Sequence, residues 1–195
     1  LLMQLGDVLE KHKQVFISSD DIYEHIHWHK EKFKNMANVY PKLRDRIIVL
    51  NGVSKAYSMT GWRIGYAAGN KEVIKKMKTL QSQSTSCASS ISQAAACTAL
   101  SSECKELPLM TAEYKKRHDY VVSKLNEIPG VTCKETDGTF YVFPSFIKYI
   151  ENSDTINNDS ELALYLLNTA KVAVVPGSAF AVSYTHLTLP TNREV

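Results

Sequence analysis

The residues best suited to covalent chemistry lie in the run SKAYSMTGWRIGY, residues 54–66. Lys55 comes three positions after the apolar run 47–52, and a lysine amine in a partly dry, cationic site can form a Schiff base. Arg63 stands eight positions later among glycines, and a guanidinium suits bidentate phosphate binding. Ser54 can donate a further hydrogen bond. Taken singly, each is more often a solvated loop residue; their spacing favours chemistry.

The elements expected to position these residues are short buried strands. The apolar run 15–18 ends just before Asp20, and the run 47–52 ends just before Lys55. The spacer between the runs is long enough to cross over and return parallel. Ligands in open parallel sheets bind at the carboxyl ends of strands, so we expect Asp20 and Lys55 to project over one crevice. Residues 63–69 are a third candidate strand.

The remaining pattern alternates helices with short strands. An α/β portion extends to a long amphipathic helix, and a smaller α+β portion follows it, with period-two patterning over 129–146 and a short strand ending at Pro176-Gly177. Asn70 is a good N-cap for the second helix. Helices are predicted over residues 1–12, 70–83, 89–100 and 103–128, and from residue 160.

Composition excludes several classes of protein. The chain has 195 residues, 44% hydrophobic and 22% charged, with a net charge of +3 spread along it rather than massed in a basic stripe. No apolar run reaches the length of a membrane span. We expect no nucleic-acid partner and no membrane partner. The four cysteines form no CxxC pair, which indicates free thiols and a cytoplasmic location. His25, His27 and His29 alternate, but no second ligand cluster accompanies them, and we expect no metal.

The segment GVSKAYSMTGWRIG, residues 52–65, resembles the lysine-attachment motif of the class I pyridoxal-phosphate (PLP) aminotransferases. The residues NGVSKAY and MTGWRIGY in this region are especially similar to those of the bacterial-type aspartate aminotransferase branch. The resemblance implies that Lys55 carries PLP covalently and that Arg63 binds the PLP phosphate, with Ser54 as a helper.

A second segment, SSDDIYEHIH at residues 18–27, resembles the family's SDEIYEHL. There the resemblance implies that Asp20 pairs with the protonated pyridine nitrogen and that Tyr23 bonds the phenolic oxygen. A carboxylate that keeps this nitrogen protonated lets the ring act as an electron sink. The implied reaction is transamination between an amino acid, aspartate above all, and a 2-oxo acid, with Lys55 as the general base.

The resemblance also implies an architecture. Residues 1–112 correspond to the C-terminal part of a PLP-binding, fold-type I large domain with a mostly parallel sheet flanked by helices, and residues 113–180 to most of an α+β small domain. Residues 181–195 depart from the family, and we expect a non-native tail there. The family enzyme is a homodimer.

Parts of the family pattern have no counterpart in this sequence. The family's phosphate cradle, ring-stacking aromatic and NPTG motif precede the segment that matches Leu1, and no arginine stands in the context of its substrate-carboxylate arginine. We therefore expect a fragment that binds PLP weakly and turns over slowly or not at all. Two alternatives stay open: another fold-type I PLP enzyme, a lyase or decarboxylase, and a non-catalytic domain that keeps the fold.

Overall fold

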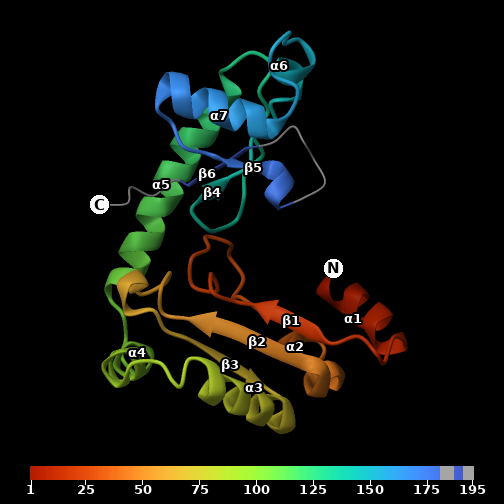
Figure 1. Cartoon of the computed structure of the whole chain (residues 1–195), viewed down its shortest axis with the longest axis vertical. Helices are drawn as coiled ribbons and strands as arrows, with labels where there is room; N and C mark the ends of the chain where they lie inside the picture. Colours follow the sequence, from red (N-terminus) through yellow and green to blue (C-terminus); the bar gives the residue numbers. More distant parts are fainter. Residues whose placement is uncertain (181–186, 191–195) are drawn as a thin grey trace. The chain divides into compact units, whose positions relative to one another are not determined.

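Two compact units, Leu1–Leu107 and Pro108–Val195, make up the computed structural model of the chain, which describes residues 1–180 and 187–190 (Figure 1). Each unit has its own core. The boundary predicted at residue 112 and the roles assigned to the two domains stay predictions. No helix among the described residues is both long enough and apolar enough to cross a bilayer.

The first unit is built on a three-stranded sheet in the order β1-β2-β3. Strand β1 (Ile17–Asp20) pairs in parallel with β2 (Ile47–Gly52), which confirms that the two apolar runs are parallel neighbours. The first strand is shifted two residues from the predicted 15–18, and Asp20 is its last residue. Strand β3 (Gly65–Gly69) is antiparallel to β2.

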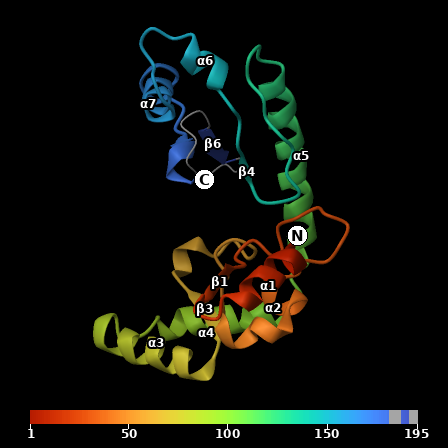
Figure 2. The ribbon, with the colours of Figure 1, turned by 90° about the vertical axis from the view of Figure 1, so that its right-hand side faces the viewer.

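Helices cover this sheet, and two of them, α2 and α3, begin at an asparagine side-chain cap. The Asn70 side chain accepts a hydrogen bond from the Glu72 amide at 2.9 Å, which confirms the predicted cap. Asn35 and Asn38 form a reciprocal capping box on a one-turn helix. Figure 2 shows α1 and α2 next to one another. The helices of this unit are α1 (Leu2–Lys11), α2 (Met36–Val39), α3 (Lys71–Ser84) and α4 (Ser90–Ser101), with 3-10 turns η1 (Pro41–Arg46) and η2 (Thr60–Trp62).

The core of the first unit lies between the sheet and its amino-terminal helices. Met36, Tyr40, Leu43 and Ile47 are all buried, and Leu2, Leu9 and Ile17 are among the partly buried residues packed against them. This cluster fixes the start of β2, since Ile47 is its first residue. Strand β2 is therefore anchored in the core at its first residue, and its other end leads to Lys55.

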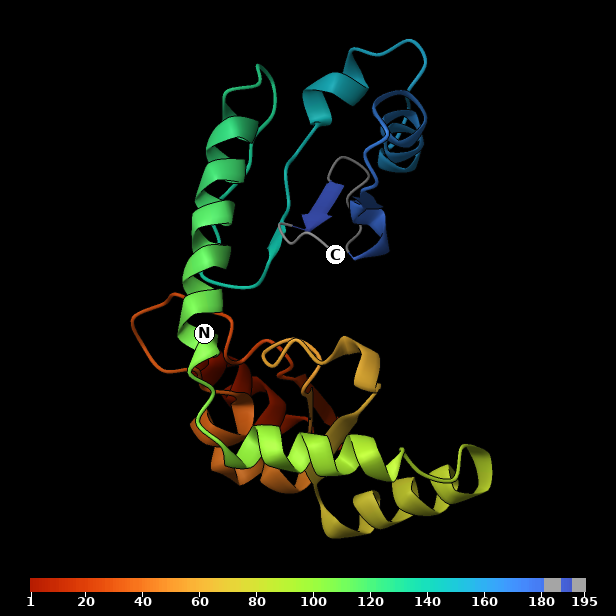
Figure 3. The same cartoon turned by 90° about the vertical axis from the view of Figure 1, so that its left-hand side faces the viewer.

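The second unit is organised around α5 (Glu106–Asn126), which begins two residues before the unit boundary. Pro108 lies in its first turn, where a missing N–H costs little. Figure 3 shows the chain returning alongside α5. His118 Nε2 accepts a hydrogen bond from the Thr136 amide at 3.1 Å in this return segment. The other elements are α6 (Ile147–Glu151), α7 (Asp159–Ala170), β4 (Tyr141–Val142), β5 (Val175–Pro176), η3 (Gly177–Ala179) and β6 (Leu187–Pro190).

The period-two pattern over residues 129–146 produces less strand than it suggests. The two-residue strand β4 and isolated bridge residues, among them the pair Thr132 and Ser145, are the extended pairing that forms there. Thr139 has φ of 69°, which interrupts an extended backbone, and Pro144 has no N–H for a ladder. The predicted non-native tail lies partly outside the described residues; within it, β6 pairs antiparallel with β4 and β5. That prediction stays open.

Candidate active site

Three of the predicted site residues lie at one end of the strands of the first unit's sheet, which is called the site edge below. Asp20 ends β1, Lys55 comes three residues after β2, and Arg63 comes two residues before β3. The carboxyl ends of parallel β1 and β2 share an edge, and antiparallel β3 starts at that edge because Gly65 pairs with Gly52. The topology thus brings a carboxylate, an amine and a guanidinium to one place from positions spread along the chain.

The turn that carries Lys55 is anchored by buried neighbours. Val53 is fully buried and Ala56 is 3% exposed, whereas Ser54 and Lys55 between them are half-buried. The Tyr57 amide donates to the Val53 carbonyl at 3.3 Å. The two buried side chains fix the backbone, so the side chains of Ser54 and Lys55 leave it from a constrained position.

Arg63 has an unusual backbone. It caps η2 in the left-handed region, with φ of 49° and ψ of 51°, where non-glycine residues are uncommon. Its side chain is exposed, and Nη1 donates to the Thr60 carbonyl at 3.0 Å. Ser58 in the same connection also has a positive φ, so this connection holds two residues with a strained backbone.

The two adjacent aspartates at the end of β1 have opposite environments. Asp20 is exposed and its Oδ1 accepts only a 3.3 Å bond from the Ile22 amide among the hydrogen bonds described for it. Asp21 is 4% exposed and accepts from the Ser19 hydroxyl at 2.7 Å and from the Asn35 side-chain amide at 2.5 Å. Asp21 is therefore engaged by its neighbours, whereas Asp20 is exposed, and the role predicted for Asp20 stays a prediction.

Tyr23 lies in a compact turn directly after these aspartates. The Glu24 amide donates to the Asp21 carbonyl, and the Ile26 amide donates to the Tyr23 carbonyl, each at 2.9 Å. The Tyr23 side chain is half-buried. All five predicted site residues, Asp20, Tyr23, Ser54, Lys55 and Arg63, therefore belong to the segments at the end of β1, the end of β2 and the start of β3.

The glycine pair Gly52–Gly65 keeps the backbone close at this edge. A Cβ on Gly52 would lie 3.2 Å from the Ile64 carbonyl oxygen, and one on Gly65 would lie 3.0 Å from that of Asn51. Neither position has room for a side chain without a shift of backbone. The segments that carry Lys55 and Arg63 therefore leave the sheet at the Gly52–Gly65 pair, where the two backbones lie close together.

Two tyrosines that the sequence reasoning did not single out surround the same edge. Burial, followed by the nearby Cys104 and then Glu24, raises the pKa of Tyr57. Burial, followed by the charge of Glu24, raises the pKa of Tyr66, which pairs with Asn51 across β2 and β3. Both raised pKa values favour the protonated phenol at neutral pH. Tyr57 stands within the lysine motif itself, which is the signal that could have found it.

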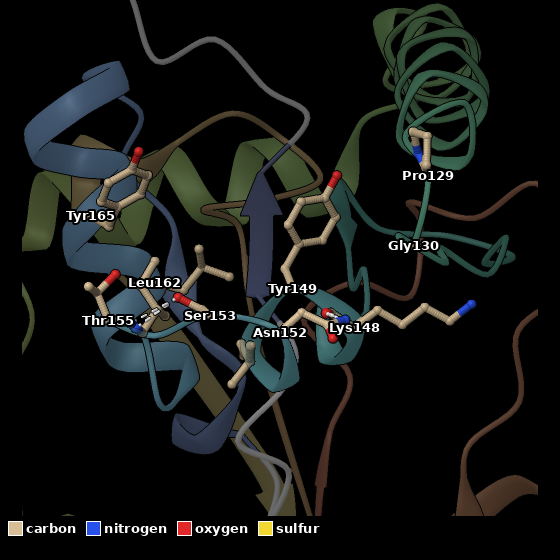
Figure 4. Close-up of a pocket in the computed structure, with 11 residues that line it drawn as sticks. Pro129, Gly130, Lys148, Tyr149, Asn152, Ser153, Thr155, Leu162 and Tyr165 are labelled. Carbon is tan, nitrogen blue, oxygen red and sulfur yellow. Dashed lines mark hydrogen bonds between the residues drawn. The ribbon is translucent and has the colours of Figure 1, made fainter.

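Neither the histidine run nor the cavity of the second unit adds to this site. No group of three or more metal-ligating side chains that could hold an ion is found among residues 1–180 and 187–190. A cavity of about 730 Å³ lies within the second unit between α6 and α7 (Figure 4). Tyr149 and Tyr165 line it, and the Lys148 side chain extends away from Tyr165 in the view. None of the predicted site residues lines this cavity.

The chain belongs to the class I and II aminotransferase family, whose model matches residues 1–192. Among its relatives are an aspartate aminotransferase from Rhizobium meliloti (strain 1021), 46% identical over 183 residues, and an aspartate/prephenate aminotransferase from Cereibacter sphaeroides, 47% identical over 186 residues. These alignments cover 92% and 93% of this chain but 45% and 46% of the relatives. The chain thus spans about half the length of the curated relatives it matches.

Solved structures agree on the fold. The crystal structure of the aspartate aminotransferase from Rhizobium meliloti superposes with a TM-score of 0.88 at 43% identity, covering 96% of this chain and 48% of that one. The aromatic aminotransferase from Pyrococcus horikoshii OT3 gives 0.86 at 30% identity, covering 99% and 50%. The predicted fold class, part of a fold-type I aminotransferase, is confirmed.

Proposed function

We propose that this chain is the coenzyme-attachment part of a PLP-dependent aminotransferase that moves the amino group of aspartate to a 2-oxo acid. The observation that carries the proposal is the gathering of Asp20, Lys55 and Arg63 at one sheet edge. The names of the relatives support aspartate as the amino donor. The family membership supports PLP as the coenzyme.

The residues present fit PLP. An exposed carboxylate, a half-buried amine and an exposed guanidinium match its pyridine nitrogen, aldehyde and phosphate. In this assignment Lys55 attaches the coenzyme, Asp20 holds the pyridine nitrogen protonated, and Arg63 binds the phosphate. When bound, PLP supplies an electron sink for the electrons of the substrate Cα–H bond.

The chain's own side chains handle the proton and the orientation. With the coenzyme bound, the Lys55 amine would act as the general base that takes the proton from the substrate Cα and would return it at C4′ of the coenzyme. Tyr23 would donate a hydrogen bond to the phenolic oxygen of the coenzyme, and Ser54 would donate one to its phosphate beside Arg63. The buried side chains of Val53 and Ala56 fix the backbone on either side of Lys55. A fixed backbone limits the positions that the Lys55 amine can reach, which favours this proton transfer.

Attachment to Lys55 can be tested directly. The purified chain is incubated with PLP, its absorbance is scanned, and the product is reduced with borohydride and digested for mass spectrometry. We expect the added mass on the peptide that contains Lys55, and we expect Lys55→Ala to abolish it. Lys30→Ala, a change of an exposed lysine in the same unit, is the matched control. Labelling that survives Lys55→Ala would refute the assignment.

We further propose that the 195-residue chain by itself binds PLP weakly and turns over slowly, because it spans about half of its relatives. Turnover is measured as consumption of aspartate and 2-oxoglutarate. An aminotransferase consumes 2-oxoglutarate in equal amount, whereas a lyase or decarboxylase consumes the amino acid alone. Tight PLP binding with steady turnover by this chain would contradict the proposal.

The assembly and location are proposed on separate grounds. Leu80 on α3 and Ile91 on α4 are 72% and 71% exposed, and large apolar side chains this open support a homodimer that would cover them. Analytical ultracentrifugation checks this, and a concentration-independent monomer would count against it. All four cysteines are free thiols, which supports the cytoplasm.

A further inference from the structure

A side-chain hydrogen bond joins the segment that carries Tyr23 to the segment that carries Lys55. The Asn51 Nδ2 group donates to Glu24 Oε1 at 2.6 Å, and this bond is partly buried. Glu24 follows Tyr23 directly, and Asn51 is the penultimate residue of β2, before the Lys55 turn. The bond thus joins the two segments that the proposed function places on either side of the coenzyme.

The Asn51 side chain is itself held on its other side. Asn51 Oδ1 accepts the Gly52 amide at 2.7 Å, so the amide plane is oriented by the backbone that leads to Lys55. An asparagine whose oxygen and nitrogen both have partners has one rotamer that satisfies both. A movement of the strand end is therefore passed on to Glu24.

Neighbouring contacts place Glu24 within the same cluster. The His25 ring lies edge-on to the Tyr57 ring, with centroids 6.2 Å apart. His25 Nε2 is also 3.4 Å from Glu24 Oε1. The Asp21 amide donates to the Leu50 carbonyl at 2.9 Å, which continues the β1–β2 ladder past Asp20. Tyr23 is thus flanked on both sides by residues that are attached to β2 or to its turn.

We propose that Glu24 and Asn51 are positioning residues: their hydrogen bond fixes Tyr23 relative to Lys55, so that the tyrosine hydroxyl meets the coenzyme attached to the lysine. This inference rests on the proposed function. Neither residue touches the reacting atoms. Asn51→Ala removes the donor, Glu24→Ala removes the acceptor, and Glu24→Gln keeps an acceptor oxygen without the charge.

The contact is tested without coenzyme by amide hydrogen exchange on the whole chain. We expect Asn51→Ala and Glu24→Ala to speed exchange about tenfold at Ile26 and at Tyr57, one amide in each joined segment, as loss of a hydrogen bond to a charged group predicts. Glu24→Gln should restore most of the protection. Glu31→Gln, an exposed glutamate in the following loop, is the control and should change neither amide.

The coenzyme gives a second, separate readout. PLP labelling that survives Lys55→Ala refutes the proposed function, whereas the exchange result alone decides whether the contact couples the two segments. Where PLP attaches, Asn51→Ala should raise its Kd about tenfold, and Glu24→Gln, which keeps an acceptor oxygen, should raise it much less. Unchanged exchange in Asn51→Ala, acceleration in only one segment, or an unchanged Kd would overturn the inference.

Discussion

The left-handed backbone of Arg63 predicts that stability and coenzyme binding separate at this position. A non-glycine residue in the left-handed region costs about 1–2 kcal/mol, and glycine escapes this cost but loses about 0.5–1 kcal/mol to its extra freedom when unfolded. Arg63→Gly should therefore be more stable than Arg63→Ala by about 1 kcal/mol. The natural arginine lies between them, since its exposed bond to the Thr60 carbonyl returns only about 0.5 kcal/mol.

Urea unfolding followed by tryptophan fluorescence measures this difference. Both tryptophans, Trp28 and Trp62, belong to the first unit, so the signal reports that unit alone. With an m-value of about 2 kcal/mol/M, a difference of about 1 kcal/mol moves the midpoint by about 0.5 M. PLP binding is measured on the same samples.

The two variants should differ in stability but not in function. Both lack the guanidinium, so both should bind PLP equally poorly. Equal midpoints for Arg63→Gly and Arg63→Ala would show that the left-handed conformation is not held in solution. PLP binding that survives in either variant would remove Arg63 from the phosphate site. The expected pattern is that of a residue retained for its side chain at the expense of local stability.

Other predictions concern the supports of each unit. Leu43→Ala should destabilise the first unit by about 2–5 kcal/mol, read from the same fluorescence titration, because it opens a cavity in the core. Asp159→Ala should destabilise the second unit by about 2–4 kcal/mol in hydrogen exchange, since the fully buried carboxylate accepts the Ser178 amide at 2.6 Å; Ser178→Ala, which keeps this amide, should cost less. The hydrogen bond from Tyr40 lowers the pKa of Glu10 below its ordinary 4.5, so its stabilisation is present above that value and is lost as pH falls through the folded-state pKa. Tyr40→Phe should flatten this acid limb of the unfolding midpoint against pH.

The parallel pairing of β1 and β2 could be predicted from the sequence, because two short apolar runs and the length of the chain between them were enough to indicate it. Two apolar runs separated by a long spacer leave few arrangements other than a crossover. The direction of β3 could not be derived in the same way. The connection from Gly52 to Gly65 holds twelve residues, a length that suits either a short crossover or an open antiparallel turn. Here it folds as irregular turns with two left-handed residues, Ser58 and Arg63.

The division of labour between Asp20 and Asp21 shows what pattern reasoning lacks. Two identical residues in sequence offer no physical reason to choose one, and the family resemblance made the choice. The structure supplies the reason: Asp21 turns inward to a partner fourteen residues away, Asn35. The bond between Glu24 and Asn51 was missed for the same cause, because it joins residues 27 positions apart.

The facing glycines at the edge of the sheet also make the lysine segment a separable module. Gly52 and Gly65 meet in register, and everything between them leaves and re-enters the sheet at that one pair. The intervening residues 53–64 could be replaced as a block by the equivalent stretch of a relative without altering any strand pairing. Gly52 and Gly65 are therefore suitable junctions for grafting, and a set of such grafts would compare different lysine-bearing loops on the same three-stranded sheet.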